Sequence, residues 1–474
     1  MPGAALAASP VSAQTPASVS EPSSASALRS PLTPKSEVWN GVLEVGGHPL
    51  RIVFRLSSTD AGWRGTMDSP DQRAYGIPLD SVVVSPLGVH LASPALRMTF
   101  SGGYLGRELL SGVFTQGGVE RALVLRRGEA VPPRRPQEPQ PPFPYRCEEV
   151  AFDGRDGAAT LHGTLTLPAG EGPFPALVLV TGSGTQNRDE EVFGHKPFLV
   201  LADFLTRRGV AVLRYDDRGY GASREEQARL QGTTTLDLTE DALGAFDFLR
   251  SHGAIDSARI GIGGHSEGGT IALFAAAREP RVAFVVSLAG MFVRGAELLA
   301  EQNRAALVDA GVPQETADAY GRALERLYAA WIERTPAELA AQRTRLLAEA
   351  TAGEALPEPL RRNLEAVIDA AQQPWFDRFV RLDPSEAAAR LGDRPCLALN
   401  GAKDRQVDAA QNLGRLQRLT QGRPAVETIR YEGLNHLFQP CTTGAVSEYA
   451  AIETTISPAV LADLAAWLQR TTQR

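Results

Sequence analysis

Ser266 stands in the segment GIGGHSEGGTIALF, where four glycines surround one serine between an apolar run and a helix-like run. The segment fits the pattern G-x-S-x-G, in which a buried strand turns abruptly into a helix and small neighbours prevent collisions at the turn. Such a turn holds the serine hydroxyl above the sheet at a helix N-terminus, where free amides favour developing negative charge. Ser266 is therefore the predicted nucleophile.

A serine hydroxyl is inert without a base, and the chain has seven histidines. His436, in EGLNHLFQ, follows the last apolar run, from where a loop can fold back over Ser266. His265 adjoins the nucleophile, so we expect its side chain to point away from the reaction site, and we expect His195 at the rim of the pocket. His436 is therefore the predicted base.

The acid of the site is expected between the serine and the histidine, at the end of a strand. Asp404 follows the apolar run PCLALN. From that position its carboxylate can accept the Nδ1 proton of His436, hold the tautomer and stabilise the imidazolium formed during attack. Asp408, four residues further on, is the alternative acid.

An oxyanion formed on attack needs amide donors. The backbone N–H of Glu267, directly after the nucleophile, is the first expected donor. The second is expected in the loop TGSG, residues 181–184, with the amide of Ser183 as our prediction. The glycines of this loop, Gly182 among them, let the backbone approach the substrate, so Gly182 is assigned to the pocket.

The elements that must position these groups are short apolar runs that end in glycine-rich loops, such as PALVLVTGSG, VAVLRYDDRG, ARIGIGGHS and VAFVVSLAG. Amphipathic stretches such as KPFLVLADFLTRRG separate them. Strands that are buried on both faces and alternate with helices predict an α/β fold, with a mostly parallel sheet flanked by helices. We assign residues 145–474 to this domain.

Residues from about 292 to about 391 interrupt this alternation, since they are rich in Ala, Leu, Glu and Arg and carry no strand signal. Open α/β sheets bind ligands at the carboxyl ends of their strands, and an insertion here can arch over that edge. We therefore expect a helical lid, with a helical appendage beside the sheet as the alternative. Aromatic residues at its end either line the acyl pocket or pin the insertion to the sheet: Trp375, Phe376 and Phe379.

The N-terminal part of the chain has a different pattern. Residues 37–128 alternate apolar and polar side chains between Gly, Pro, Asp or Ser breaks, which predicts a small antiparallel β domain, a barrel or a sandwich. Residues 129–144 are rich in proline and predict an extended linker. Residues 1–36 are rich in Ala, Ser and Pro and are expected to be disordered. Val11, Ser12 and Ala13 are typical of a signal-peptide cleavage site, but a basic n-region is missing, so periplasmic or secreted and cytoplasmic locations both stay open.

Composition excludes several classes of partner. The net charge of −7 argues against a nucleic-acid partner, whose phosphates demand a basic face. No run of apolar residues is long enough to span a membrane. The three cysteines lie far apart and fit neither a zinc site nor a disulfide framework. We expect no metal and no organic cofactor, a small-molecule ester as substrate, and leave a homo-oligomer open.

Residues from about 145 to 468 resemble bacterial esterase-like serine hydrolases of the α/β-hydrolase superfamily, related to the serine aminopeptidase group. The segments TGSGTQNRDE, RYDDRGYGAS, GGHSEGG, NGAKDRQV and NHLFQ carry the resemblance. It implies Ser266 as nucleophile, Asp404 as acid and His436 as base. The sequence departs from many relatives at Thr181, where they have a histidine. The β domain resembles, less closely, a module found on such bacterial hydrolases.

These observations favour a hydrolase that cleaves carboxylic esters of small to medium acyl chains through an acyl-enzyme intermediate. A peptidase that removes short N-terminal units is one alternative, because the insertion carries acidic residues that could hold an ammonium group, although arginines lie among them at helical spacing. A binding protein on a hydrolase scaffold, with the β domain as recognition module, is the other.

Overall fold

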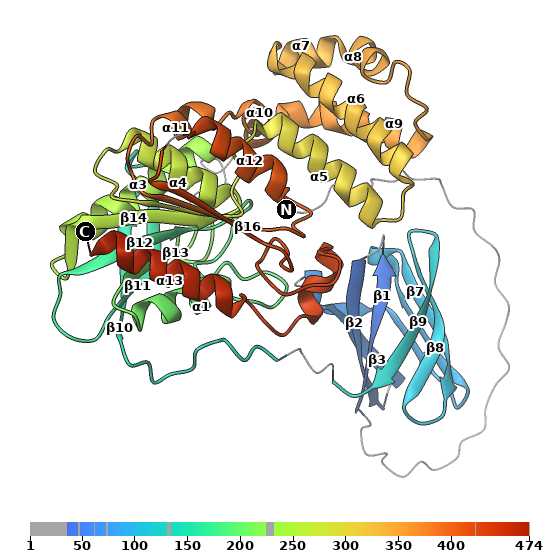
Figure 1. The fold of residues 1–474 in the computed structure, drawn as a ribbon. Coiled ribbons are helices and arrows are strands. Elements are labelled where there is room, and N and C mark those ends of the chain that lie inside the picture. Colours follow the sequence, from blue (N-terminus) through green and yellow to red (C-terminus); the bar gives the residue numbers. More distant parts are fainter. Residues whose placement is uncertain are drawn as a thin grey trace, which may run out of the picture. The chain divides into compact units, whose positions relative to one another are not determined.

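The computed structural model describes residues 36–45, 48–60, 62–72, 74–129, 134–223, 232–421 and 423–473. The chain divides into two compact units, one up to residue 132 and one from residue 133 onward, and each is described by itself (Figure 1). The tail that the sequence predicts to be disordered lies outside the described residues, apart from Ser36. Among the described residues, no helix has the length and apolar character that crossing a membrane requires.

The N-terminal unit is an antiparallel β meander. Its strands are β1 (Ser36–Val45), β2 (His48–Thr59), β3 (Gly62–Ser69), β4 (Ala74–Leu79), β5 (Ser81–Val84), β6 (Gly88–Ser93), β7 (Met98–Leu105), β8 (Leu109–Gln116) and β9 (Val119–Arg127). The order in the sheet is β4-β3-β2-β1-β9-β8-β7-β6-β5. The two edge strands, β4 and β5, are separated in the chain by Asp80 alone. The sheet therefore curls so that its two edge strands come close together, as in a barrel. A barrel is one of the two architectures that the sequence predicts.

The interior of this unit is filled by side chains from alternate strand positions, as a small barrel requires. Trp39, Phe54, Phe100 and Phe114 are at most 1% exposed. The rings of Phe54 and Phe100 stack with their centroids 5.7 Å apart. The period-two pattern of the sequence thus marks the inward-facing positions, and an all-β region precedes the second unit as predicted.

The second unit is built on an eight-stranded sheet in the order β10-β11-β13-β12-β14-β15-β16-β17. Its strands are β10 (Arg146–Asp153), β11 (Thr160–Leu167), β12 (Phe174–Val180), β13 (Ala211–Tyr215), β14 (Ile255–His265), β15 (Val285–Leu288), β16 (Cys396–Gly401) and β17 (Val426–Tyr431). The strands from β13 to β17 in this order run parallel, and β10 and β11 form an antiparallel edge. All carboxyl ends of the parallel strands therefore lie at one edge, where the site is built.

Helices cover both faces of this sheet. They are α1 (Pro197–Thr206), α3 (Thr235–Ser251), α4 (Glu267–Arg278), α12 (Ala409–Leu419) and α13 (Pro458–Thr472). Apolar side chains of α3, α4 and α12 pack in one core with the sheet, whereas those of α1 and α13 pack in another. The parallel sheet between helices confirms the predicted fold class.

The predicted helical insertion lies between β15 and β16. It contains α5 (Gly295–Asp309), α6 (Gln314–Ile332), α7 (Pro336–Ala341), α8 (Arg343–Ala350), α9 (Glu358–Asp369), α10 (Pro374–Arg381) and α11 (Ser385–Ala389). Buried side chains of α5 to α10, among them Tyr328 and Trp331, form a core of their own. The insertion is therefore a packed subdomain, while its action as a lid stays a prediction.

Part of the segment predicted as a linker is bonded to the second unit. Arg135 donates to the backbone oxygens of Gly194, Ala450 and Ile452, each at 2.9 Å. The Gln137 side chain accepts from the amide of Thr455 at 2.6 Å. Two polar side chains thus tie this proline-rich stretch to residues more than three hundred positions later.

Candidate active site

Ser266 occupies the turn between β14 and α4. Its backbone has φ 54° and ψ −121°, a conformation that L-residues rarely adopt. The glycines around it allow the close approach of the backbones: a Cβ on Gly268 would lie 2.0 Å from the carbonyl oxygen of Val180, and one on Gly264 would lie 2.5 Å from the same atom. This local geometry is that of a strained strand-to-helix turn that presents a serine at a helix N-terminus.

His436 and Asp404 meet at the same edge of the sheet, in the loops that follow β17 and β16. His436 Nδ1 lies 2.7 Å from Asp404 Oδ2. The other carboxylate oxygen of Asp404 accepts two backbone N–H groups, from Gln406 and Val407, both at 2.8 Å. Both side chains are buried. Because a carboxylate faces Nδ1, that nitrogen carries the proton and Nε2 is left as the acceptor, the form a general base needs.

Asp408, the alternative acid, has a structural position. Its Oδ1 accepts from the amide of Gln411 at 2.6 Å and caps the N-terminus of α12. An aspartate at this position satisfies a helix amide that would otherwise lack a partner. The structure therefore separates the two candidates, with Asp404 alone paired to the histidine.

Ser266 is linked to this pair through its neighbour, His265. The ring centroids of His265 and His436 lie 4.5 Å apart, and His265 Nε2 lies 2.9 Å from the backbone oxygen of His436. In the described part of the chain no hydrogen bond joins the Ser266 hydroxyl to His436. Such bonds often tighten only when substrate binds. The expectation that the His265 side chain points away from the site is corrected, since its ring packs on that of the predicted base.

The two predicted oxyanion donors are positioned by different elements. Glu267 is the first residue of α4, so the helix itself offers its N–H no acceptor. In the loop after β12, the Gly182 N–H donates to Glu190 Oε1 at 2.8 Å and is occupied. The Ser183 N–H makes no hydrogen bond within the described residues. Gly182 lies directly behind the nucleophile, because a Cβ there would be 3.2 Å from the Cβ of Ser266.

The loop after β12 is braced from β13. Thr181 donates its hydroxyl to Asp217 Oδ1 at 2.7 Å. The second Asp217 oxygen accepts from the amide of Gln186 at 2.8 Å. Burial raises the pKa of Asp217, and the bonds from Thr181 and Gln186 oppose that shift. Thr181 therefore supports the loop by a side-chain bond of its own.

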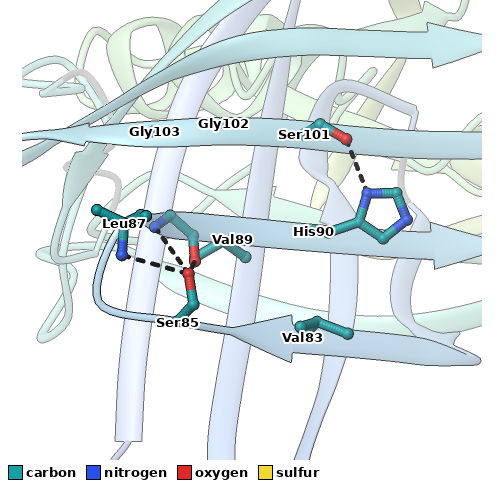
Figure 2. A pocket seen from close by; sticks show the side chains of 9 residues that line it. Val83, Ser85, Leu87, Val89, His90, Ser101, Gly102 and Gly103 are labelled. Carbon is teal, nitrogen blue, oxygen red and sulfur yellow. Dashed lines mark hydrogen bonds between the residues drawn. The ribbon is translucent and has the colours of Figure 1, made fainter.

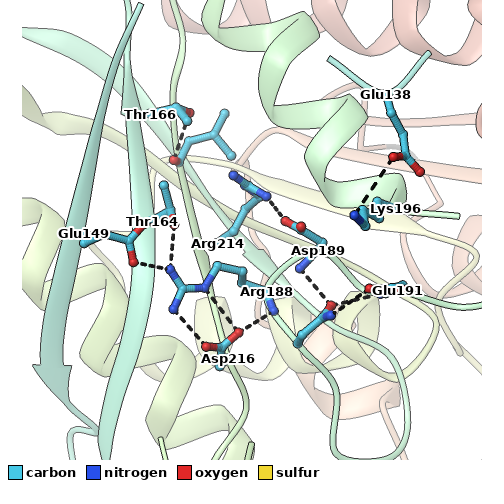
Figure 3. A network of polar contacts seen from close by, with 12 residues as sticks. Glu138, Glu149, Thr164, Thr166, Arg188, Asp189, Glu191, Lys196, Arg214 and Asp216 are labelled. Carbon is cyan, nitrogen blue, oxygen red and sulfur yellow. Dashed lines mark hydrogen bonds and ion pairs between the residues drawn. The ribbon is translucent and has the colours of Figure 1, made fainter. Parts of the chain in front are cut away.

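A charged network extends this bracing (Figure 3). Arg188 donates to Asp216 at 2.8 Å and to Glu149 at 2.6 Å, and its own amide donates to Asp216 at 2.8 Å. Arg214, which is 4% exposed, pairs with Asp189 beside it. Of the two aspartates in RYDDRGYGAS, Asp216 is thus bound by Arg188 and Asp217 by Thr181 and Gln186, so both support the loop after β12.

His195 is buried rather than at a rim, so that expectation is wrong. Its ring is 0% exposed and lies between Thr455 Oγ1 and the backbone oxygen of Tyr449, each at 3.0 Å from a ring nitrogen. Burial lowers the pKa of His195 to about 4. The ring is therefore neutral and holds two loops together. Sequence patterning could not reveal this, because a loop histidine carries no sign of what folds over it.

Trp375 connects the helical insertion to the nucleophile turn. Its Nε1 donates to Glu267 Oε1 at 3.1 Å, and the Thr235 hydroxyl donates to the same oxygen at 2.6 Å. Phe379 stacks on Trp375 with ring centroids 4.9 Å apart and is buried in the core of the insertion. Phe376 packs edge-on against Trp331, with centroids 5.8 Å apart. The ring contacts of Phe376 and Phe379 thus lie within the insertion, whereas Trp375 also reaches the turn at Ser266.

A second serine–histidine pair occurs in the N-terminal unit. His90 Nδ1 lies 2.7 Å from Ser101 Oγ in a shallow hollow of about 430 Å³ (Figure 2). The residues lining the hollow include no carboxylate, and Ser101 lies within strand β7 rather than at a helix N-terminus. This pair lacks the acid and the amides that an activated serine requires.

Comparisons with known proteins identify the family of the chain. Residues 177–446 match the family described as "Alpha/beta hydrolase family". The chain is 30% identical to the esterase EstD of Thermotoga maritima over 296 residues, 62% of each chain, so it spans less than two thirds of that relative. It is 32% identical to 2,6-dihydropseudooxynicotine hydrolase of Paenarthrobacter nicotinovorans over 147 residues, 31% of this chain and 35% of the relative. A solved puromycin-hydrolyzing peptidase of Mycobacterium tuberculosis is similar at 18% identity and TM-score 0.44, over 89% of this chain and 52% of that one.

Proposed function

Because the chain belongs to the alpha/beta hydrolase family, we propose that it is a serine hydrolase that cleaves carboxylic esters of small to medium acyl chains. The observation that carries the proposal is the buried His436–Asp404 pair at 2.7 Å, beside a serine held at φ 54°. The similarity to the esterase EstD supports the choice of an ester bond.

In this proposal Ser266 Oγ attacks the ester carbonyl carbon while His436 Nε2 takes the hydroxyl proton. The amides of Glu267 and Ser183 donate to the oxyanion of the tetrahedral intermediate. The intermediate collapses to an acyl-serine, and the departing alkoxide takes the proton from His436. Water then attacks the acyl carbon, with His436 again as the base, and the free acid leaves as Ser266 recovers its proton. Each proton taken by the base is returned within the cycle.

The surroundings of Asp404 support its role as the acid. Two backbone amides hold one carboxylate oxygen, and the second oxygen faces His436. Both oxygens therefore face N–H donors, and a negatively charged carboxylate can accept at both of them. That charge stabilises the imidazolium that forms when the base takes the proton.

One observation favours a second candidate, the hydrolysis of short peptides or aminoacyl amides. Glu267, next to the nucleophile, is 4% exposed, and its Oε2 is buried without a hydrogen-bond partner among the described residues. A substrate ammonium group would supply that missing donor. The acidic residues of the insertion fit this role less well, since Glu301 is paired with Arg304.

Turnover of p-nitrophenyl acetate, butyrate and octanoate, compared with alanine 4-nitroanilide, tests the proposal. We expect the short esters to be the better substrates and Ser266→Ala to abolish their turnover. Ser287→Ala is the matched control, because the Ser287 hydroxyl is also buried near the turn but makes no hydrogen bond in the described part of the structure. Ester turnover that survives in Ser266→Ala contradicts the proposal, and a preference for the anilide favours the second candidate.

A further inference from the structure

Glu190 and His265 form a buried pair that contacts the predicted oxyanion loop, residues 181–184, and the loop of His436. Glu190, in the segment between β12 and α1, is 2% exposed. Its Oε1 accepts the Gly182 N–H at 2.8 Å and lies 2.9 Å from His265 Nδ1. The second nitrogen of His265 lies 2.9 Å from the backbone oxygen of His436. One chain of contacts therefore runs from the oxyanion loop through the nucleophile turn to the loop of the base.

The partners of His265 determine its protonation state. Both ring nitrogens face oxygens that only accept hydrogen bonds, a carboxylate and a backbone carbonyl. A neutral imidazole has one N–H, so one nitrogen would turn its lone pair toward an oxygen, and only the imidazolium donates to both. Burial by itself lowers the pKa of His265, but the charge and hydrogen bond of Glu190 and the carbonyl of His436 outweigh it, so the pKa is raised.

The surroundings of the pair make its charge costly. The side chains around it include Phe198, Leu201, Leu288 and Phe438. Glu190 Oε2 has no hydrogen-bond partner in the described part of the chain. A buried ion pair with an unsatisfied oxygen gives little or no net stability compared with well-packed apolar side chains. Glu190 also has φ +51°, and such backbone conformations gather at functional sites.

We propose that Glu190 and His265 are positioning residues: as a buried ion pair they hold the loop of His436 and the oxyanion loop in register with Ser266. The expected effect on kcat/KM rests on the proposed function, whereas the ion pair itself rests on the contacts alone. Neither side chain takes part in bond making. Their effect on the reaction passes through the His436 carbonyl and the Gly182 amide.

The pair also places the His265 ring beside that of His436. The charged or titratable groups that face His436 are Asp404, His265 and Tyr449, and burial raises the pKa of Tyr449, which stays neutral. The His265 cation, 4.5 Å away between ring centroids, opposes a second positive charge on His436. In Glu190→Gln that cation is lost, so the acidic limb of the kcat/KM profile should move to higher pH.

Nitrogen-15 NMR of the wild-type protein labelled in its histidines tests the protonation state directly. The NMR signals of the His265 ring are identified as those that are missing in the spectrum of His265→Gln. Should that variant not fold, they are identified by the contacts of the His265 ring with the ring of His436. We expect both ring nitrogens of His265 to stay protonated to higher pH than those of an ordinary histidine, whose pKa is roughly 6.5. A His265 ring that loses its proton at or below the ordinary histidine pKa of roughly 6.5 overturns the ion pair.

Steady-state kinetics of Glu190→Gln, His265→Gln and the double variant test the positioning role. We expect each single variant to lose about tenfold to hundredfold in kcat/KM, because small misplacements of reacting groups are this costly. The double variant should lose no more than the worse single variant, since the two residues act as a unit. The matched control is Glu148→Gln, which removes a Glu–His pair of 3.1 Å at the surface and should leave kcat/KM unchanged.

The positioning role is overturned when the single variants fold and keep both the wild-type kcat/KM and the acidic limb of its pH profile. It is also overturned when the loss of kcat/KM in the double variant equals the two single losses combined. A wild-type protein that hydrolyses neither the p-nitrophenyl esters nor alanine 4-nitroanilide is a failure of the proposed function instead. The NMR result then still decides whether the ion pair exists.

Discussion

Asp404→Asn isolates the step that, in the proposed mechanism, prepares His436 as a base. The Oδ1 atom of Asp404 is fixed by the N–H groups of Gln406 and Val407, both at 2.8 Å. The asparagine must place its carbonyl oxygen at that position, since turning the amide round would leave two buried donors unpaired at about 1–3 kcal/mol each. Its NH₂ group then faces His436 Nδ1. The histidine is forced to carry its proton on Nε2, where it cannot accept one from Ser266.

The expected loss follows from the wrong tautomer. Replacing the aspartate of such a triad by asparagine costs about 10⁴ in kcat, which corresponds to about 5 kcal/mol in the barrier. The assay is kcat for p-nitrophenyl butyrate at neutral pH, with urea unfolding to show that the variant is folded. The matched control is Asp408→Asn, which should keep its activity because asparagine caps a helix as well as aspartate does. A folded Asp404→Asn enzyme that keeps about a tenth or more of its kcat refutes the reasoning, and so does a large loss in Asp408→Asn.

Three further predictions concern the surroundings of the site. Trp375→Phe should lower the free energy of unfolding in urea by about 1–3 kcal/mol, because it removes a donor from the buried carboxylate of Glu267; an unchanged free energy contradicts this. Gly268→Ala should destabilise the fold by about 1–3 kcal/mol or more, since its Cβ would lie 2.0 Å from a backbone oxygen of β12. Gly414→Ala, in the helix α12, is the control and should be neutral or stabilising. Equal urea midpoints for the two variants disprove the clash. The free energy of unfolding of the wild type should exceed that of His265→Gln by its full amount below about pH 6.5, the ordinary histidine pKa. This difference should shrink as the pH rises through the raised folded-state pKa of His265. A difference that grows towards pH 9 contradicts the prediction.

The sequence was sufficient for the elements with strong local signals. Continuous apolar runs ending in glycine loops predicted the parallel strands, and the crowded glycines around Ser266 predicted the strained turn that the structure has at φ 54°. The order of serine, aspartate and histidine after β14, β16 and β17 led to the pairing of His436 with Asp404. Each of these inferences rests on periodicity or on a steric demand that neighbouring residues reveal.

The contacts that the sequence did not predict join segments far apart in the chain. Glu190 and His265 are 75 positions apart, and neither neighbourhood indicates that the two side chains meet. The nearest available signal was the position of His265 directly before Ser266. A histidine at that turn is buried, and a buried histidine can carry a positive charge only when a negatively charged partner faces it. Arg135 is likewise bonded to residues more than three hundred positions away. Such pairings depend on how loops fold over one another, and residue spacing carries no record of it.

Trapping the covalent intermediate tests the central claim most directly. The enzyme is mixed with excess p-nitrophenyl butyrate, quenched in acid during turnover, and digested for mass spectrometry of the peptide that contains residues 261–274. We predict a butyryl group on Ser266, and none when His436 is replaced by alanine. A folded, active enzyme whose acyl group sits on another residue, or whose turnover proceeds with Ser266 never acylated, contradicts the account.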